Sequence, residues 1–203
     1  MTGSLASLIT EVSARLAEAQ VPSPQYDAQE LVALALGMER KALLGLVTTG
    51  ESISLTPEQA ARLDDLVARR SARVPLQHLT GSVGFRHVEL AVGPGVFVPR
   101  PETELLAGWA IEQAAPLAAP VVVDLCTGSG AIAKSVADEV PQARVYAVEL
   151  GDSAHAWAAR NLAGTGVELR HGDMAEAFDE LAGTVDVVVS NPPYVPLEAW
   201  ESG

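Results

Sequence analysis

The sequence predicts an α/β fold, with a parallel, doubly wound sheet in the C-terminal half and a small helical domain before it. Residues 121–190 alternate short apolar runs with segments of helical periodicity, which is the pattern of consecutive βαβ units. A glycine-containing loop follows the first run, as in sheets that bind a ligand at their strand ends. Residues 1–73 show helical periodicity only. We therefore expect two domains, with a linker over residues 74–100 and the second domain over residues 101–203.

Helical periodicity and capping signals divide the N-terminal domain. Ser23 as a cap, Pro24 at the first helical position and Gly37 at the end predict the bounds of one helix. Thr56 and Gln59 have the spacing of a capping box and predict the start of another. Four helices are expected, over residues 4–19, 23–37, 39–46 and 56–73. Their apolar stripes predict a core, and we expect the domain to bind a partner.

The linker over residues 74–100 is expected to contain a β-hairpin. Two short apolar runs, Val83–Phe85 and Val88–Val92, flank a polar turn and predict its strands. Prolines then exclude regular structure until Pro101, which we expect to open a helix that ends near Ala115.

Four strands are predicted in the C-terminal domain. They are expected over residues 121–125, 144–148, 167–170 and 185–190, with helices over 131–140, 152–163 and 175–181. The valine run at residues 187–189 has no polar alternation, so we expect it to be buried on both faces. Pro192 and Pro193 cannot continue a sheet, because they have no amide hydrogen and a fixed φ. The chain should leave the sheet at Asn191, at a strand end where α/β sheets bind ligands.

Composition and charge exclude several classes of protein. The chain of 203 residues is 48% hydrophobic and has a net charge of −13, which fits a globular protein and argues against a broad nucleic-acid surface. No apolar run approaches the roughly 20 residues that span a bilayer, and the N-terminus has no signal-peptide pattern. The single cysteine, Cys126, suits a reducing compartment, so we expect a cytoplasmic protein without membrane or direct nucleic-acid partners. The histidines are scattered, and no metal site is predicted.

Asn191, Pro192, Pro193 and Tyr194 form the strongest candidate for a substrate site. A residue before proline is held in extended geometry, so this turn is stiff. The side-chain oxygen of Asn191 and the backbone carbonyl of Pro192 could together accept hydrogen bonds from a planar NH2 group, beside the aromatic wall of Tyr194. The alternative is a strand that ends in a plain Asn-Pro turn. Phe97, beside a rigid Pro-Arg-Pro-Glu turn, is expected either in a pocket wall or in an interdomain connector.

The loop between the first strand and its helix predicts a nucleoside cofactor. Gly128 and Gly130 allow a tight turn and a close approach of the backbone to a ligand. Glu149 ends the second strand about 20 residues after Gly130, which suits an acid that binds ribose hydroxyls. Asp173 ends the third strand and could accept the amino group of adenine, and Met174 could pack on the ring.

Two cofactors compete for these strand ends, and a glycine turn without a ligand is a third interpretation. Gly128 and Gly130 nominally match the fingerprint of a dinucleotide-binding loop. However, Asp124 at the loop entrance would repel a pyrophosphate and attract a cationic amino acid group. Hydride transfer also has no evident need for the amide-binding turn at Asn191. S-adenosylmethionine is therefore preferred, with Asp124 near its methionine part, Glu149 near its ribose and Asp173 near its adenine.

Four features then occur together: VFVPRPETELL, VVDLCTGSGAIA, an acid at Glu149 and SNPPYVP, all after a helical domain. In these features the chain resembles the HemK/PrmC family of release-factor glutamine methyltransferases over nearly its whole length. The Asn-Pro-Pro-Tyr motif is shared with other amino-group methyltransferases, and Pro-Arg-Pro-Glu-Thr narrows the resemblance to this family. The resemblance implies a Rossmann-like class I methyltransferase sheet. It also implies methyl transfer from S-adenosylmethionine, which becomes S-adenosylhomocysteine, to the glutamine amide in the Gly-Gly-Gln motif of class-1 peptide-chain release factors.

The resemblance also implies roles for individual residues. Cofactor contacts carry over to Cys126, Thr127, Gly128, Ser129, Gly130, Glu149 and Met174. The glutamine would be held by Asn191, Pro192, Pro193 and Tyr194, with Asn191 also near the cofactor and Phe97 beside the reaction centre. Asn191, Pro192 and Tyr194 are the expected catalytic residues. A carboxamide nitrogen has no useful pKa near neutrality, so we expect catalysis by positioning and no general base.

Three features depart from the family pattern. Cys126 stands where the family usually has glycine, and Glu149 replaces the commoner aspartate. The chain ends at Gly203, before the fifth strand and the antiparallel strand pair of such enzymes. We therefore expect a C-terminally truncated chain in which Val187–Val189 is a bare apolar edge, unless another segment covers it. Two alternatives remain: an adenine-N6 nucleic-acid methyltransferase, which the net charge of −13 disfavours, and an inactive, truncated interaction module.

Overall fold

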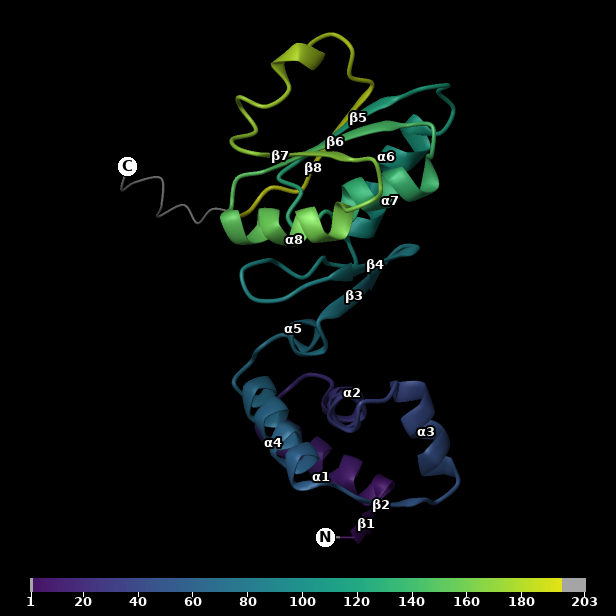
Figure 1. The fold of residues 1–203 in the computed structure, drawn as a ribbon, viewed down its shortest axis with the longest axis vertical. Helices are drawn as coiled ribbons and strands as arrows, with labels where there is room; N and C mark the ends of the chain where they lie inside the picture. The colour runs from purple at the N-terminus through teal and green to yellow at the C-terminus, as the bar shows by residue number, and fades with distance from the viewer. Residues whose placement is uncertain (1, 195–203) are drawn as a thin grey trace, which may run out of the picture. The chain divides into compact units, whose positions relative to one another are not determined.

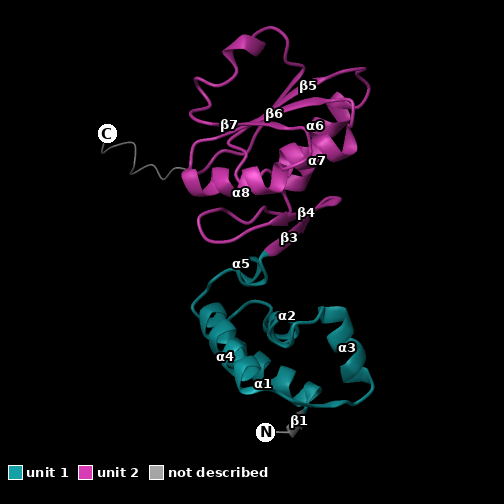
Figure 2. Cartoon of the chain, in the orientation of Figure 1, with its two compact units in different colours: residues 1–81 teal, residues 82–203 magenta. Residues whose placement is uncertain are grey.

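A computed structural model describes residues 2–194 of the chain (Figure 1). The chain divides into two compact units, residues 1–81 and residues 82–203 (Figure 2). Each unit has its own hydrophobic core. This division agrees with the expectation of a helical part followed by an α/β part.

Unit 1 is built from helices, and its four expected helices are confirmed. Its helices are α1 (Leu5–Glu18), α2 (Pro24–Leu36), α3 (Arg40–Thr48), α4 (Pro57–Ser71) and α5 (Leu76–Thr80). A two-stranded antiparallel sheet of β1 (Thr2–Ser4) and β2 (Ser52–Ser54) was not expected. Strands of three residues carry too little periodicity to be recognised in a sequence. Fully buried leucines from the helices, among them Leu16, Leu31 and Leu43, form the core.

The capping signals have different outcomes. The capping box at Thr56 and Gln59 is confirmed: the Thr56 hydroxyl accepts from the N–H of Gln59 at 3.2 Å, and the Gln59 side chain accepts from the N–H of Thr56 at 3.0 Å. Gly37 ends α2 in the left-handed conformation, as expected. The side chain of Ser23 makes no capping hydrogen bond, so that part of the prediction is wrong. Pro24 still occupies the first turn of α2, where its missing N–H costs nothing.

The segment that was expected to be a linker, residues 74–100, is shared between the two units. Its first part forms α5, whose Leu76 and Leu79 are buried in the core of unit 1. Its second part forms a hairpin of β3 (Ser82–Phe85) and β4 (Val88–Ala91), which belongs to unit 2. The boundary therefore falls between residues 81 and 82, because the apolar side chains on either side of it pack into different cores.

Unit 2 contains a four-stranded parallel sheet, which confirms the predicted fold class. The strands are β5 (Val121–Leu125), β6 (Arg144–Glu149), β7 (Glu168–His171) and β8 (Val187–Ser190), in the spatial order β7-β6-β5-β8. The helices are α6 (Thr103–Ala114), α7 (Ala131–Glu139) and α8 (Asp152–Leu162). The chain passes from β5 outward to β7 and then returns to the other side of β5, so the order of strands reverses beside β5.

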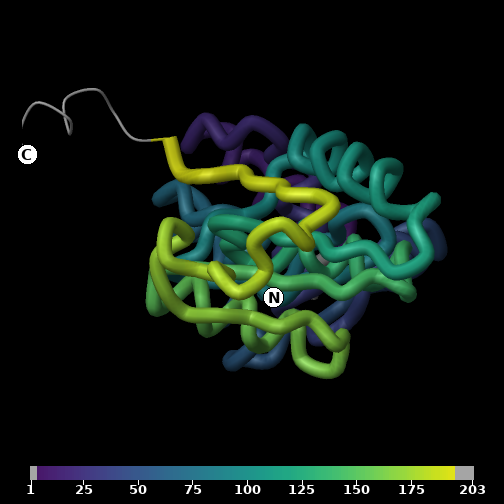
Figure 3. Tube along the Cα trace, turned by 90° about the horizontal axis from the view of Figure 1, so that it is seen from above, coloured from purple at the N-terminus to yellow at the C-terminus, as the bar shows by residue number. Residues whose placement is uncertain are grey.

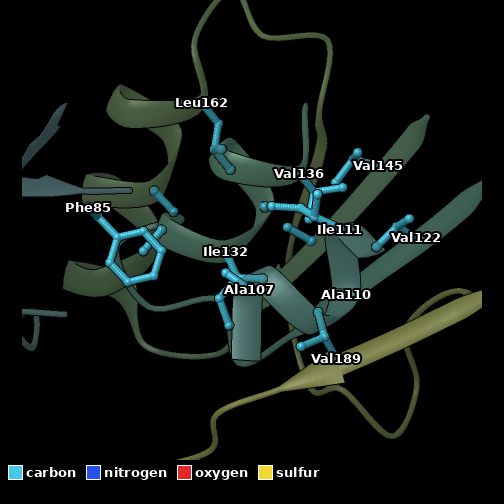
Figure 4. Close-up of a cluster of buried hydrophobic side chains, with 14 of the residues drawn as sticks. Phe85, Ala107, Ala110, Ile111, Val122, Ile132, Val136, Val145, Leu162 and Val189 are labelled. Atoms are coloured by element: carbon cyan, nitrogen blue, oxygen red, sulfur yellow. The ribbon is translucent and has the colours of Figure 1, made fainter. Parts of the chain in front are cut away.

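One face of the sheet carries the main core of unit 2. Valines on alternate positions of three strands, Val122, Val145 and Val189, meet Ile111 of α6 and Ile132 of α7 (Figure 4). The hairpin contributes Phe85 to the same cluster, where it is 2% exposed. Alternation of side chains along each strand explains why every second residue reaches this core.

The opposite face is covered differently from the prediction. A second cluster joins Val123, Val148 and Phe178, which come from β5, β6 and the segment before β8. The prediction of a helix over residues 175–181 is wrong, because this segment forms only a 3₁₀ helix, η1 (Asp179–Leu181). Phe178 takes a left-handed backbone conformation with φ of 67°, which is incompatible with a continuous α-helix through this segment.

β8 lies at an edge of the sheet, where it pairs with β5 on one side within residues 2–194. Val187 and Val189 are buried, but Val188 is 53% exposed, so burial of this strand on both faces is a wrong prediction. α6 lies against β8, and Figure 3 shows β8 (yellow) near this helix (teal). The expected truncation at Gly203 and the last two residues of the SNPPYVP motif lie outside the described residues.

Candidate functional site

The predicted site residues follow the carboxyl ends of adjacent strands. Leu125 of β5 is in register with Val148 of β6 and Ser190 of β8, so the three strands end together. The glycine loop leaves β5 at residue 126, Glu149 ends β6 and Asn191 follows β8. Neighbouring strands lie about 4.8 Å apart, which brings these side chains to one edge of the sheet. This arrangement next to a reversal of strand order is where open α/β sheets bind ligands.

The glycine loop has a tight backbone that three left-handed residues make possible. Cys126, Gly128 and Gly130 have φ of 57°, 60° and 84°. A Cβ on Gly130 would lie 3.0 Å from Leu162, so a larger residue here would crowd that side chain as well as strain the backbone. A Cβ on Gly128 would meet nothing within 4 Å. The loop therefore packs closely against α8 at Gly130 and leaves space beside Gly128 that a ligand can use.

Asp124 lies beneath the loop and not at its open entrance. Its side chain is buried, and Oδ2 accepts hydrogen bonds from the Thr127 hydroxyl at 2.6 Å and from the N–H of Ala133 at 3.1 Å. Oδ1 is buried without a partner among the described residues. Burial raises the pKa of Asp124 to about 7, and the negative charge of Glu149 adds to this shift. Asp124 therefore supports the loop from below.

Thr127 and Ser129 are also buried components of the loop. The Thr127 hydroxyl is bonded to Asp124, and the backbone N–H of Thr127 donates to the carbonyl of Val148 at 3.0 Å. Ser129 is 3% exposed, and its carbonyl accepts from the side chain of Asn161 at 2.8 Å. The Thr127 side chain and the Ser129 carbonyl thus help to fix the shape of the loop.

Glu149 links two backbone segments at the end of β6. Its Oε2 accepts from the N–H of Gly128 at 2.8 Å, and its Oε1 accepts from the N–H of Gly151 at 2.9 Å. Each carboxylate oxygen can accept more than one hydrogen bond. The half-buried carboxylate of Glu149 is thus fixed beside the loop and can still accept bonds from a diol.

Two sulfur atoms meet at the same edge. The Sγ of Cys126 lies 3.5 Å from the Sδ of Met174, which joins the loop after β5 to the segment after β7. Burial raises the pKa of the Cys126 thiol, and the charge of Glu149 raises it further, so the thiol is held in its neutral form. Met174 and Leu150 are 47% and 65% exposed, and such accessible apolar side chains suit contact with a flat ring.

Asp173 precedes Met174 and is exposed. Its Oδ1 accepts from the N–H of Ala175 at 2.9 Å, which fixes the side chain in a local turn. Oδ2 remains an acceptor that faces solvent or a ligand. The structure thus places Asp173, Met174 and Cys126 in one continuous part of the site.

The Asn-Pro-Pro-Tyr segment is connected to the start of α6. Nδ2 of Asn191 donates to the Thr103 hydroxyl at 3.1 Å, and within residues 2–194 the Oδ1 of Asn191 has no hydrogen-bond donor. Arg100 lies 5.9 Å from the centre of the Tyr194 ring. Phe97 and Tyr194 are 87% and 81% exposed. The Pro-Arg-Pro-Glu-Thr and Asn-Pro-Pro-Tyr motifs, far apart in sequence, therefore lie together.

Sequence reasoning missed three residues that support the site. Thr103 binds Asn191, and the Ser190 hydroxyl donates to the carbonyl of Leu125 at 2.9 Å, which ties β8 to the start of the glycine loop. The side chain of Asn161 bridges the carbonyl of Ser129 and the backbone of β4. Asn161 occupies a buried position on a helix, and such a polar residue in an apolar stripe was the available signal.

The other parts of residues 2–194 offer no comparable set of chemical groups. Within residues 2–194, no group of three or more His, Cys, Asp or Glu side chains is placed to hold a metal ion. In the same range no helix has the length and apolarity needed to cross a bilayer. A concavity of about 490 Å³ lies along α8 and β7, away from the strand ends, and it is lined mainly by small and apolar residues. We therefore assign the site from the strand ends and not from this hollow.

Comparison with known proteins gives matches over both units. A family model described as the PrmC N-terminal domain matches residues 7–81, and one described as the methyltransferase small domain matches residues 101–200. The chain is 52% identical to the release factor glutamine methyltransferase of Streptomyces coelicolor, over 95% of this chain and 66% of that protein. It is 41% identical to the protein of that name from Bifidobacterium longum, over 95% of this chain and 69% of that protein.

A third relative has the same name. The release factor glutamine methyltransferase of Mycobacterium tuberculosis is 45% identical over 95% of this chain and 63% of that protein. The chain therefore spans between 63% and 69% of the length of these three relatives.

Proposed function

The chain belongs to the family of release factor glutamine methyltransferases, and from this premise we propose that it methylates the glutamine of the Gly-Gly-Gln motif in class-1 peptide-chain release factors. The methyl group would come from S-adenosylmethionine and would be transferred to the side-chain amide nitrogen. One observation supports this most directly. Within residues 2–194, the amide oxygen of Asn191 has no hydrogen-bond donor, and it lies one strand away from a glycine loop with space for a ligand.

The residues at the strand ends fit S-adenosylmethionine. Glu149 would accept hydrogen bonds from the ribose hydroxyls, because its carboxylate is already oriented by two backbone amides. Asp173 would accept from the adenine amino group, with Met174 against the ring. The loop of Cys126, Thr127, Gly128, Ser129 and Gly130 would surround the methionine part, and buried Asp124 would fix that loop from below.

The buried Oδ1 of Asp124, which has no hydrogen-bond partner among the described residues, adds to this fit. A buried carboxylate atom without a donor is costly, and a cationic group near the loop would relieve part of that cost. A pyrophosphate would instead add negative charge above an acid whose pKa already stands near 7. This supports a sulfonium amino acid cofactor over a dinucleotide.

The chain's own residues would act by orientation. The bound cofactor would supply an electrophilic methyl group. Asn191 Oδ1 and the Pro192 carbonyl would accept the two N–H groups of the glutamine amide and so aim its nitrogen. The same oxygens would stabilise positive charge that develops on that nitrogen. Orientation of reactants can lower a barrier by up to about 7–11 kcal/mol. The carbon–sulfur bond of the cofactor would break as the carbon–nitrogen bond forms, so that S-adenosylhomocysteine leaves. The methylated amide nitrogen would then release one proton to solvent, and because a protonated amide nitrogen is a strong acid, no general base is required.

The aromatic residues around the turn would complete the substrate site. Phe97 and Tyr194 are almost fully exposed, which leaves both free to enclose a glutamine side chain and to exclude water. Pro193 would keep the turn stiff between Pro192 and Tyr194. Arg100 beside Tyr194 would help to orient that ring.

We also propose that the protein acts in the cytoplasm and that unit 1 contacts the release factor. The net charge of −13 supports a basic protein partner and disfavours an oligonucleotide substrate. The family match of residues 7–81 to a dedicated N-terminal domain supports a role for unit 1 that differs from methyl transfer itself.

A methyl-transfer assay tests this function. The protein is incubated with S-adenosylmethionine labelled in its methyl group and with a class-1 release factor. A matched release factor carries alanine in place of the glutamine of its Gly-Gly-Gln motif, and an adenine-containing oligonucleotide is the third substrate. Label is expected in the first release factor alone. Label in the oligonucleotide would contradict the proposal, and label in none of the three would support an inactive interaction module.

A further inference from the structure

We propose that Thr103 is a positioning residue, whose hydroxyl holds the side-chain amide of Asn191 in the orientation that presents Oδ1 to the substrate. The inference rests on the proposed function, because it assigns a task to Asn191 in that function. Thr103 lies outside the Asn-Pro-Pro-Tyr motif. In the sequence, all four strands of the parallel sheet lie between Thr103 and Asn191. The supporting observation is the hydrogen bond from Asn191 Nδ2 to Thr103 Oγ1 at 3.1 Å.

Thr103 is fixed in space by a rigid start to α6. Three successive turns precede and overlap the helix: the N–H groups of Thr103, Glu104 and Leu105 donate to the carbonyls three residues earlier, at 3.0, 3.1 and 3.2 Å. Pro101 lies within these turns and restricts the backbone further. Thr103 is half-buried, and its β-branched side chain has few rotamers. Its hydroxyl oxygen is therefore held in a fixed position, where it accepts from Asn191.

The backbone of Asn191 is held by its neighbours, whereas its side chain depends on the bond to Thr103. The Ser190 hydroxyl is bonded to Leu125, and Pro192 restricts the residue before it to extended geometry. The Asn191 side chain itself is exposed, so burial does not set its rotation. Within residues 2–194 the bond to Thr103 is the hydrogen bond that holds its amide.

The orientation of this amide decides whether the site can accept an NH2 group. With Nδ2 directed at Thr103, Oδ1 points away from the helix and remains an acceptor. A rotation by half a turn would present the Asn191 NH2 group to the NH2 group of the substrate, and two donors cannot form a hydrogen bond. Because torsions of this kind have two broad minima, an unrestrained side chain would occupy both.

The experiment compares Thr103→Val with Thr103→Ser. Valine keeps the shape of the side chain and removes the acceptor, whereas serine restores it. Thr184→Val is the matched control, because Thr184 is an exposed threonine of the same unit whose hydroxyl donates to the Leu181 carbonyl at 2.7 Å. The first readout is the side-chain NH2 signal of Asn191 in ¹⁵N-labelled protein, identified by its loss in Asn191→Ala. The second is the kinetics of methyl transfer to a release factor.

We expect Thr103→Val to shift the Asn191 NH2 signals and to lower kcat about tenfold, as for the loss of one hydrogen bond in the reaction geometry. KM for S-adenosylmethionine should change by less than about twofold, because Thr103 acts on the binding of the glutamine substrate and not on that of the cofactor. Thr103→Ser should restore both the signals and kcat, and Thr184→Val should alter neither.

The failures of the inference and of the proposed function can be distinguished. Unchanged Asn191 signals in Thr103→Val would overturn the inference, whatever the activity. An equal loss of kcat in Thr103→Val and Thr103→Ser would also overturn it, since the hydroxyl would then be irrelevant. A wild-type protein that methylates no release factor would contradict the proposed function, while a shift of the Asn191 signals in Thr103→Val would still support the contact that positions this amide.

Discussion

The carboxylate of Glu149 accepts a hydrogen bond from the backbone N–H of Gly128 at 2.8 Å, so the acid that ends β6 also holds the glycine loop that follows β5. Its second oxygen accepts from Gly151 at 2.9 Å. An aspartate is shorter by one methylene and could not keep the same reach to both amides. The side chain of Glu149 therefore organises the glycine loop before any ligand binds.

Glu149→Gln should weaken the binding of S-adenosylmethionine. The variant keeps the length of the side chain but replaces one acceptor oxygen with an NH2 group, which opposes a backbone N–H. We expect a fall in affinity of about tenfold or more, as for the loss of a charged hydrogen-bond acceptor. Isothermal titration calorimetry measures the change. Glu89→Gln, at an exposed acid on β4, is the control, and equal losses in the two variants would contradict a specific role for Glu149.

Asn191→Ala should abolish methyl transfer and leave the cofactor bound. The substitution removes the acceptor for the substrate amide and the bond to Thr103 but touches no part of the glycine loop. We expect kcat to fall by a factor of about 100 or more, which corresponds to a loss of nearly 3 kcal/mol in the transition state. Single-turnover methylation measures kcat, and calorimetry measures cofactor affinity. Full activity in this variant would exclude the proposed role of Asn191.

Cys126→Gly should stabilise unit 2. A non-glycine residue with φ of 57° is strained by about 1–2 kcal/mol, and glycine adopts this conformation freely. Loss of the contact with Met174 and the greater freedom of unfolded glycine offset part of the gain, so the expected net increase in unfolding free energy is about 0.5–1 kcal/mol.

Urea unfolding followed by tryptophan fluorescence measures this change, because Trp109 and Trp157 both belong to unit 2. Cys126→Ala is the control: it removes the sulfur but keeps a Cβ in the strained conformation. It should be less stable than the glycine variant. The opposite ranking would show that the sulfur contact outweighs the backbone strain.

Asp124 should make unit 2 less stable as the pH rises from about 4 to about 7. Its pKa is raised to about 7 in the folded protein, while an unfolded aspartate titrates near 3.9. Between these values the folded state holds one proton more than the unfolded state, so the free energy of unfolding falls as the pH increases. Above a pH of about 7 both states have lost that proton, and Asp124 no longer makes the free energy of unfolding depend on pH.

Asp124→Asn tests this dependence in cofactor-free protein. The variant cannot ionise, so its unfolding free energy relative to wild type should rise by about 1–3 kcal/mol between pH 5 and pH 7. Urea unfolding at each pH measures the difference. A constant difference across this range would mean that Asp124 stays ionised when it is buried.

The sequence predicted most elements of the fold because their signals are local. The capping box at Thr56, the alternation of strands and helices, and the hairpin before α6 are each encoded by residues close to one another. The 3₁₀ segment at Asp179–Leu181 was not predicted. Phe178 packs into the second core with a left-handed backbone, and this conformation depends on tertiary packing that local sequence does not encode.

The site was predictable in part for the same reason. Asn191, Glu149 and the glycine loop could be placed together, because parallel strands end at a common edge. The inward direction of Asp124 could not be predicted, since it depends on hydrogen bonds to Thr127 and Ala133 beneath the loop. The role of Thr103 could not be predicted either, because its partner, Asn191, follows β8 and is far away in sequence.

Two separate cores within one chain have a consequence for thermal measurements. A ligand stabilises only the cooperative part of a protein to which it binds, by an amount set by its concentration relative to its dissociation constant. All the proposed cofactor contacts belong to residues 82–203. In calorimetry, S-adenosylmethionine should therefore move the melting of that core directly, and any shift in the melting of residues 1–81 would measure how strongly the two cores are coupled.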